Sequence, residues 1–267
     1  MADLLSAIVA AARTSADGRA RASAADVERQ ASARAPRGEA FVASLRQPGV
    51  RVIAECKRRS PSRGVLRAIY EPAAIAAGYA DAGAAAISVL TEPAFFDGSL
   101  DHLRAVRAAV TLPLLRKDFL VTEFQLVEAR ATGADAVLLI VAALGDQALR
   151  ALIAYAASLG LAALVEVHDR AELDRALAAG ATVIGVNSRN LRTLDVSPTV
   201  FDDLAPHLPA SVTSIAESGL KTPSDVSRLT AMGFRAFLIG ERFMTEPDPG
   251  GALRTLVARA SSQAVRA

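Results

Sequence analysis

Several residue types are scarce in this sequence, and each scarcity excludes a class of protein or site. Its 267 residues contain one cysteine, Cys56, which rules out an internal disulfide and a cluster of thiolate metal ligands. The three histidines, at positions 102, 168 and 207, do not have the spacing of metal ligands. A net charge of +2 without a long basic run argues against a nucleic-acid partner. We therefore expect a metal-free protein in a reducing compartment.

Uncharged apolar runs of the roughly 20 residues that a membrane helix needs are also missing. No basic residue precedes the short apolar stretch before Arg13, so this stretch predicts an amphipathic helix rather than a signal peptide. Apolar residues make up 52% of the chain, which is enough for a sizeable core. These features predict a soluble, cytoplasmic protein that has no membrane partner.

Lysine is scarce as well, because only Lys57, Lys117 and Lys221 are lysines among thirty basic residues. Arginine keeps its proton in a protein, whereas burial and neighbouring charges shift the pKa of a lysine. Lys57 and Lys117 each end an apolar run that predicts a strand, VRVIAECK and PLLRK. Chance in an arginine-rich composition would explain any single lysine, but two at strand ends favour a functional role for both.

A segment of about fifty residues recurs four times along the sequence. In each copy a glycine precedes an apolar, strand-like run, and these glycines are Gly83, Gly133, Gly180 and Gly233. Glycine suits the left-handed position that follows a helix, so the unit is a helix, a tight turn and a buried strand. Four further strands are expected between the copies, at 52–57, 113–117, 162–167 and 212–217. Eight strands alternating with eight helices predict an α/β fold, a (β/α)8 TIM barrel.

The first forty-odd residues lie outside the repeat and end near a Gln47-Pro48-Gly49 turn. We expect an N-terminal helical extension, residues 1–47, packed on a catalytic barrel of residues 48–267. No linker rich in proline, glycine or serine divides the rest of the chain, so the whole is expected to form a single domain.

Charged residues gather at the carboxyl ends of the predicted strands, where the active sites of such barrels form. Alternation along the first strand points Glu55 and Lys57 into the barrel mouth and Cys56 into the helix layer, as a core residue. Further polar residues at strand ends are Lys117, Glu166, Asn187, Arg189, Glu217 and Ser218. Any one carboxylate could be a structural ion-pair partner. A whole ring of carboxylates and lysines around one cavity instead favours proton transfer.

The last two strands predict a phosphate site. Glu217-Ser218-Gly219 precedes a helix start in which Thr222 is a suitable N-cap, with Asp225 three residues later. Gly240 follows the eighth strand and allows a ligand to approach the backbone closely. Loops after the seventh and eighth strands commonly bind phosphate in this fold.

The run IAECKRRSPSRGVL, which begins at Ile53, resembles the E-x-K-x-x-S-P-S signature of the indole-3-glycerol-phosphate synthase family. Further segments resemble this family in its order, among them LLRKDFLVTEFQLVEAR, LVEVHD, IGVNSRNLRTLDV and AESGLKTPSD, and the resemblance covers about 41–258. It implies a monofunctional, cofactor-free lyase of tryptophan biosynthesis. This enzyme converts 1-(2-carboxyphenylamino)-1-deoxyribulose 5-phosphate to indole-3-glycerol phosphate and releases carbon dioxide and water.

The resemblance also implies roles for individual residues. Lys117 would be the general acid at the substrate ketone. Lys57 would contact the substrate carboxylate and is a candidate acid for the later dehydration. Glu55 and Glu166 would be acid/base partners that Asn187 orients. Which lysine and which glutamate act in each step stays open, since several assignments satisfy the same chemistry.

Further residues would bind the substrate. The resemblance assigns Glu217 and Ser218 to its polar chain, Ser60, Arg189, Gly219 and Gly240 to the carboxylate or phosphate subsites, and Phe96 and Phe119 to the anthranilate ring. Glu241 stands where serine or threonine also occur in the family. Its carboxylate would lie close to the phosphate, so only its backbone N–H can bind there.

Three other readings compete with this one. Another phosphosugar barrel, such as a phosphoribosylanthranilate isomerase, would favour a Cys or Asp acid/base pair, and Cys56 is expected on the wrong face. A phosphate-binding barrel without turnover would not need the five intact catalytic positions. A paralogue acting on a modified anthranilate would have a very similar sequence. The expected partner is a small phosphorylated substrate, and the expected state is a monomer or a weak homo-oligomer.

Overall fold

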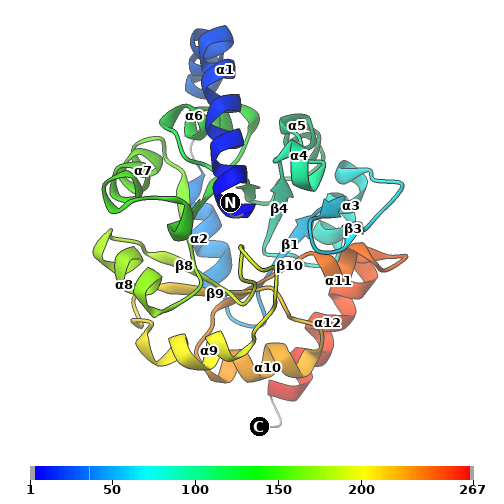
Figure 1. Cartoon of the computed structure of the whole chain (residues 1–267). Helices are drawn as coiled ribbons and strands as arrows, with labels where there is room; N and C mark the ends of the chain where they lie inside the picture. The colour runs from blue at the N-terminus through cyan, green and yellow to red at the C-terminus, as the bar shows by residue number, and fades with distance from the viewer. Residues whose placement is uncertain (1–3, 36, 265–267) are drawn as a thin grey trace.

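The apolar runs predicted as strands form one closed, parallel barrel in a computed structural model that describes residues 4–35 and 37–264 (Figure 1). Each strand pairs with the next along the chain, and the last pairs with the first in the register Val52 to Phe237. The strands are β1 (Val52–Cys56), β4 (Ala86–Leu90), β5 (Leu114–Lys117), β6 (Ala136–Ile140), β7 (Ala162–Val167), β8 (Val183–Asn187), β9 (Thr213–Glu217) and β10 (Ala236–Ile239). The predicted TIM barrel is confirmed.

A ring of helices surrounds the barrel: α3 (Pro72–Asp81), α5 (Leu100–Ala109), α6 (Glu123–Thr132), α7 (Asp146–Ser158), α8 (Arg170–Ala178), α9 (Thr199–Leu204), α10 (Pro223–Ala231) and α12 (Pro249–Ala264). The four glycines of the repeat each end one of these helices with a positive φ, between 84° and 99°. A side chain with a Cβ is strained in that conformation, which is why the repeat is visible in the sequence.

Several short elements were not predicted. Strands β2 (Arg59–Ser60) and β3 (Gly64–Val65) form a hairpin after β1, and the helical turns are α4 (Pro93–Phe96), η1 (Val141–Ala143), η2 (Ala205–His207) and α11 (Glu241–Met244). Elements of two to four residues are too short to produce a hydrophobic period. All except η2 directly follow the carboxyl end of a barrel strand, and they therefore shape its mouth.

The second helix of the extension, α2 (Gly38–Arg46), closes the amino end of the barrel. Phe41 and Leu45 are fully buried in the cluster that fills the barrel interior. Arg46 Nε donates a hydrogen bond of 2.7 Å to Thr213 Oγ1 at the start of β9. A Cβ on Gly38 would lie 2.5 Å from the backbone nitrogen of Ala162 at the start of β7, so only glycine allows this approach.

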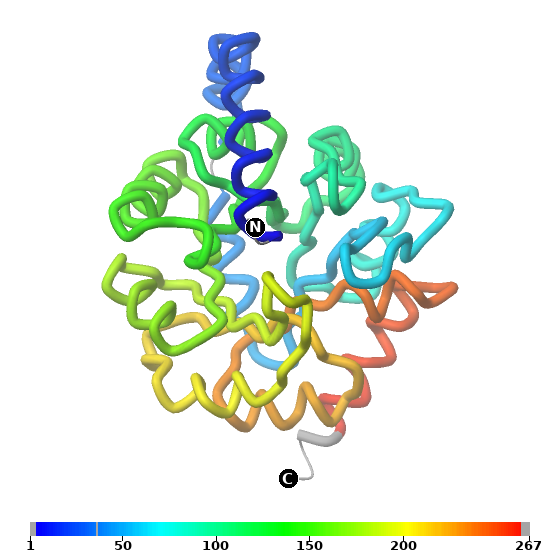
Figure 2. The backbone as a smooth tube through the Cα atoms, in the orientation of Figure 1, coloured from blue at the N-terminus to red at the C-terminus, as the bar shows by residue number. Residues whose placement is uncertain are grey.

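The first helix, α1 (Leu4–Ser32), reaches the opposite end of the barrel. It packs along α6, where Arg19 makes two hydrogen bonds of 2.6 and 2.9 Å to the buried carboxylate of Glu128. Near its amino end, Leu5 and Ile8 are buried in the same cluster as Phe119 at the mouth. Figures 1 and 2 show α1 rising from the centre of the ring past α6. The extension therefore touches both ends of the barrel.

The division at residue 48 stays a prediction. Residues 1–3 and 36 of the expected extension, and 265–267 of the expected barrel segment, lie outside the described residues. Cys56, the last residue of β1, is fully buried on the side of the strand that faces the helix layer, as predicted. Burial, and then the nearby Glu55 charge, raise the pKa of its thiol.

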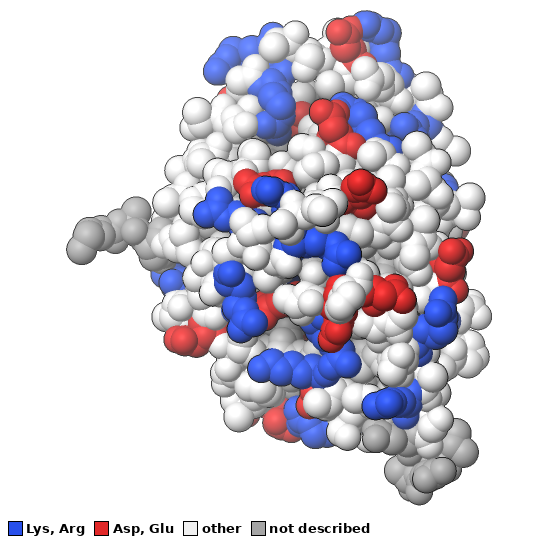
Figure 3. Space-filling model, turned by 90° about the vertical axis from the view of Figure 1, so that its right-hand side faces the viewer, with Lys and Arg blue, Asp and Glu red and all other residues white. Residues whose placement is uncertain are grey.

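Acidic and basic side chains are interspersed over the face that Figure 3 shows. Within 4–35 and 37–264, no helix combines the length and the apolarity that crossing a membrane requires.

Candidate active site

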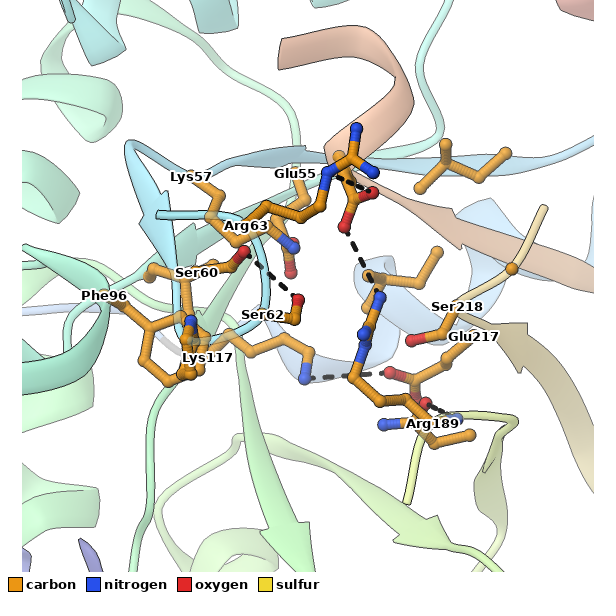
Figure 4. A pocket seen from close by; sticks show the side chains of 18 of the residues that line it. Glu55, Lys57, Ser60, Ser62, Arg63, Phe96, Lys117, Arg189, Glu217 and Ser218 are labelled. Atoms are coloured by element: carbon orange, nitrogen blue, oxygen red, sulfur yellow. Dashed lines mark hydrogen bonds and ion pairs between the residues drawn. The ribbon is translucent and has the colours of Figure 1, made fainter. Parts of the chain in front are cut away.

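The carboxyl ends of the strands surround a cavity of about 540 Å³ (Figure 4). All fourteen residues proposed from the sequence line it: Glu55, Lys57, Ser60, Phe96, Lys117, Phe119, Glu166, Asn187, Arg189, Glu217, Ser218, Gly219, Gly240 and Glu241. Leu138, Ile140 and Leu238, from β6 and β10, add apolar surface to the cavity wall. A concave site with a few converging charges on an apolar wall is typical of a small-molecule site.

Glu55 and Lys57 form an ion pair on one side of the cavity, with Lys57 Nζ 2.7 Å from Glu55 Oε1. The other carboxylate oxygen of Glu55 accepts a hydrogen bond of 3.3 Å from Ser88 Oγ. Burial alone would raise the pKa of Glu55, but the Lys57 and Lys117 charges outweigh burial and lower that pKa. Glu55 is therefore an ionised, hydrogen-bonded carboxylate at neutral pH.

Lys117 lies between two buried glutamates, 3.2 Å from Glu166 Oε2 and 3.7 Å from Glu217 Oε2. Burial would lower the pKa of Lys117, but the charges of Glu166, Glu217 and Glu55 raise it instead. The pKa values of these two glutamates shift in opposite directions. Burial raises the pKa of Glu166, but Lys117 and His168 reverse this and hold it well below its ordinary range. Burial and then the Glu166 charge raise the pKa of Glu217 well above its ordinary range, which favours its protonated form.

His168 is a neighbour of the site that the sequence analysis missed. Its Nε2 lies 3.3 Å from Glu166 Oε1, and its Nδ1 lies 2.9 Å from the carboxylate of Glu172. Burial would lower the pKa of His168, but these two carboxylates raise it to about 10. The sequence did contain a signal, because His168 follows Glu166 by two residues, directly after the end of β7, and alternation then places both side chains on one side of the chain.

Glycines make room for the buried glutamates. A Cβ on Gly185 of β8 would overlap Oε1 of Glu217, and a Cβ on Gly240 would overlap Oε1 of Glu55. The sequence analysis explained Gly240 by a close approach to phosphate, whereas the atoms nearest to its missing side chain belong to Glu55. It did not single out Gly185, because a glycine in the middle of a strand has no sequence partner that reveals its purpose.

The predicted phosphate side is built from the turn after β9 and the loop after β8. Ser218 and Gly219 have φ of 66° and 71°, a conformation that is strained for a serine and that concentrates at functional sites. The predicted capping box of α10 is confirmed, since Thr222 N donates to Asp225 Oδ2 at 2.8 Å and Asp225 N donates to Thr222 Oγ1 at 3.1 Å.

Glu241 lies between two arginines at the edge of this side. Its carboxylate is 3.4 Å from Arg189 Nη2 and 3.6 Å from Arg63 Nε. Arg63 lies in the hairpin loop between β2 and β3, which the sequence did not reveal, and so it was missed. The two arginines offset the carboxylate that the sequence analysis found out of place beside a phosphate.

The aromatic side of the cavity comes from Phe96 and Phe119, whose ring centroids are 6.4 Å apart. Glu92 is a structural residue, because its carboxylate caps α4 by accepting hydrogen bonds from three backbone N–H groups, including that of Phe96. The carboxylate of Asp118, directly after β5, forms a buried ion pair of 2.9 Å with Arg116 on that strand. These two carboxylates position the phenylalanines and the strand end.

Across the described ranges 4–35 and 37–264, no group of three or more His, Cys, Asp or Glu side chains could hold a metal ion. That the reaction needs neither a metal nor a cofactor stays a prediction.

A family model described as indole-3-glycerol phosphate synthase matches residues 5–256. The chain belongs to this family. It is 54% identical over 239 residues to the indole-3-glycerol phosphate synthase of Saccharopolyspora erythraea, covering 90% of this chain and 89% of that protein. It is 55% identical over 216 residues to that of Mycolicibacterium smegmatis, covering 81% and 79%.

Solved structures with lower identity share the fold of this indole-3-glycerol phosphate synthase family member. The KGPDC of Streptococcus mutans aligns with a TM-score of 0.62 at 12% identity, over 80% of this chain and 99% of that one. Thiamine phosphate pyrophosphorylase from Pyrococcus furiosus aligns with a TM-score of 0.61 at 15% identity, over 80% and 96%. At this identity the two structures show a shared barrel fold and nothing about activity.

Proposed function

We propose that this protein is an indole-3-glycerol-phosphate synthase, which closes the indole ring of 1-(2-carboxyphenylamino)-1-deoxyribulose 5-phosphate with loss of carbon dioxide and water. The observation that carries the proposal is Lys117, a charged ammonium held between Glu166 and Glu217 in a cavity that also contains the Glu55–Lys57 pair. Membership of the family supports the same conclusion.

The first chemical step forms a carbon–carbon bond. The ring carbon that bears the carboxylate attacks the ketone carbon, and Lys117 Nζ gives a proton to the ketone oxygen, which becomes a hydroxyl. When Lys117 loses its charge, Glu166 loses the partner that holds its pKa down, and its affinity for a proton rises. The proton stored on Glu217 is then available to restore the lysine.

The later steps remove carbon dioxide and water. Loss of carbon dioxide returns its bonding electrons to the ring system, and departure of the new hydroxyl as water needs one acid and one base. The Glu55–Lys57 pair on the other side of the cavity supplies a second acid and base for this dehydration. Lys57 also binds the substrate carboxylate before it leaves, and Asn187, which helps to lower the pKa of Glu166, orients that carboxylate.

The remaining lining residues bind the substrate. The phosphate lies against the Ser218-Gly219 turn and the backbone N–H of Glu241, close to the guanidinium groups of Arg189 and Arg63. Phe96 and Phe119 pack on the anthranilate ring. Ser60 in β2 and Gly240 complete the cavity wall at its polar end.

We also propose that the chain acts in the cytoplasm as a monomer or a weak homo-oligomer. Its partner is the small phosphorylated substrate, without nucleic acid or a membrane. A phosphoribosylanthranilate isomerase is disfavoured because Cys56, the one cysteine of the chain, is buried outside the barrel and away from the cavity.

The decisive experiment is turnover by the purified protein in the presence of a metal chelator, followed by indole fluorescence. We expect indole-3-glycerol phosphate to form at the same rate with and without the chelator. Bound substrate without ring closure would instead identify a phosphate-binding barrel. Faster closure of a ring-substituted anthranilate substrate would identify a paralogue of a specialised pathway.

A further inference from the structure

A histidine with no assigned role connects the catalytic cavity to the helix layer. One carboxylate oxygen of Glu166 lies 3.2 Å from Lys117 Nζ, and its other oxygen lies 3.3 Å from His168 Nε2. The opposite ring nitrogen of His168 lies 2.9 Å from Glu172 Oε2. Lysine, carboxylate, imidazole and carboxylate therefore form one continuous chain.

The start of α8 clamps the outer end of this chain. Asp169 is the N-cap of α8, and its carboxylate accepts a hydrogen bond of 2.8 Å from Glu172 N. The same Glu172 oxygen that meets the imidazole also accepts a hydrogen bond of 2.9 Å from the backbone N–H of His168. Two contacts to one oxygen, made from the first turn of a helix, leave the imidazole little rotational freedom.

The charges around the chain balance only if the imidazole is protonated. Glu166 on β7 and Glu172 on α8 face His168, while Lys117 on β5 and Glu217 on β9 face Glu166 from the other side. With a proton on Glu217, which its raised pKa favours, Lys117 alone would oppose the carboxylates of Glu166 and Glu172. An imidazolium restores neutrality, which matters because an uncompensated buried charge is costly.

We propose that His168 is a positioning residue for the proton transfer of Lys117: its imidazolium, anchored by Glu172, keeps Glu166 ionised and aimed at the ammonium. The raised pKa of His168, at about 10, agrees with a charged ring throughout the neutral range. The expected effect of His168 on kcat rests on the proposed function. The protonation of His168 and its contacts with Glu166 and Glu172 can be tested without turnover.

The structural part is tested by NMR titration of the histidine ring protons. We expect His168 to stay protonated to about pH 9, and to return toward the ordinary value in Glu172→Gln, where one of its two carboxylates is neutral. The exposed His207 serves as the internal reference. A His168 that titrates near pH 6.5 in the wild-type protein would overturn the proposal even if the protein makes no indole product.

The kinetic part uses His168→Gln, which keeps an N–H donor but removes the charge, with His207→Gln as the matched control. We expect kcat to fall roughly ten- to a hundredfold with little change in KM, a fraction of what general acid–base catalysis contributes. The acid limb of the pH profile should move to higher pH, because Glu166 loses a cation that lowers its pKa. Glu172→Gln should shift the limb in the same direction.

A purely structural histidine would lower the melting temperature without moving that limb. An unchanged limb in a folded, active His168→Gln variant therefore overturns the proposal. Failure of the wild-type protein to close the ring would instead count against the proposed function and would leave the titration result standing.

Discussion

The two lysines of the cavity have the same exposure and opposite surroundings. The side chains of Lys57 and Lys117 are each 16% exposed. Lys57 meets one carboxylate, that of Glu55, at 2.7 Å, whereas Lys117 lies between Glu166 and Glu217. The two lysines are equally exposed, so their surroundings differ only in the number of carboxylates near each ammonium group.

A pair and a cluster respond differently to a proton. The Glu55–Lys57 pair is neutral with both partners charged, and its groups have no reason to exchange a proton at rest. The Lys117 cluster has one carboxylate more than its ammonium can balance, so the pKa of Glu217 rises and its protonated form is favoured. The comparison teaches that a surplus acid beside a lysine favours a proton on one carboxyl group at rest, whereas a matched pair keeps both of its charges until the substrate draws on them as acid and base.

The largest expected effect comes from Lys117→Met, which removes the ammonium and keeps the side-chain length. We expect kcat to fall by roughly a thousandfold or more, in the range of a lost general acid, while inorganic phosphate still binds. Steady-state kinetics and a phosphate titration measure the two effects. Lys221→Met is the control, because Lys221 is exposed at the rim. A fully active Lys117→Met would remove Lys117 as the general acid.

The next effect separates the two glutamates of the cluster. Glu166→Gln replaces an ionised group, and we expect a loss in kcat of roughly a hundredfold or more. Glu217→Gln replaces a group whose raised pKa favours the neutral form, so the amide preserves the charge but cannot return a proton to Lys117, and we expect a smaller loss of about tenfold. Equal losses in kcat, measured at pH 7, would mean that the proton is shared rather than stored on Glu217.

The smallest effect concerns the glycines that face the two glutamates. Gly185→Ala places a methyl group on Glu217, and Gly240→Ala places one on Glu55. We expect each to lower the free energy of unfolding by about 1–3 kcal/mol, as overpacking does. Gly145→Ala is the control, since a Cβ there meets nothing within 4 Å. Urea unfolding measures all three.

The partner of Gly185 can be checked with a double-mutant cycle. In a Glu217→Ala background, Gly185→Ala should cost clearly less than in the wild-type protein, because the overlapping oxygen is gone. If the two costs are additive, the methyl group is accommodated elsewhere, and the side chain of Glu217 is not the reason that position 185 requires glycine.

Much of the site was accessible from the sequence because a barrel translates order into position. Parallel strands bring all their carboxyl ends to one mouth, so Glu55, Lys117, Glu166, Asn187 and Glu217 had to converge once the barrel was recognised. Alternation along β1 correctly separated the inward residues from Cys56. The lysine scarcity led to the same strand ends, and Lys221 proved to lie at the exposed rim of the cavity.

The residues that were missed act through contacts between distant segments or within loops. Arg63 reaches Glu241 from a hairpin of two-residue strands, and Gly185 is explained only by the side chain of Glu217 on the next strand. The reach of α1 to the mouth depends on its packing against α6, which no period in either helix specifies.

The sequence alone therefore determined the barrel, its mouth and the residue types that line it, because hydrophobic period and strand order are local properties that a closed parallel barrel turns into geometry. Only the tertiary structure decided which carboxylate is charged. Glu55, Glu166 and Glu217 look alike in the sequence, and their pKa values diverge because Coulomb energies in a buried cavity depend on distances of 2.7 to 3.7 Å to Lys57, Lys117 and His168.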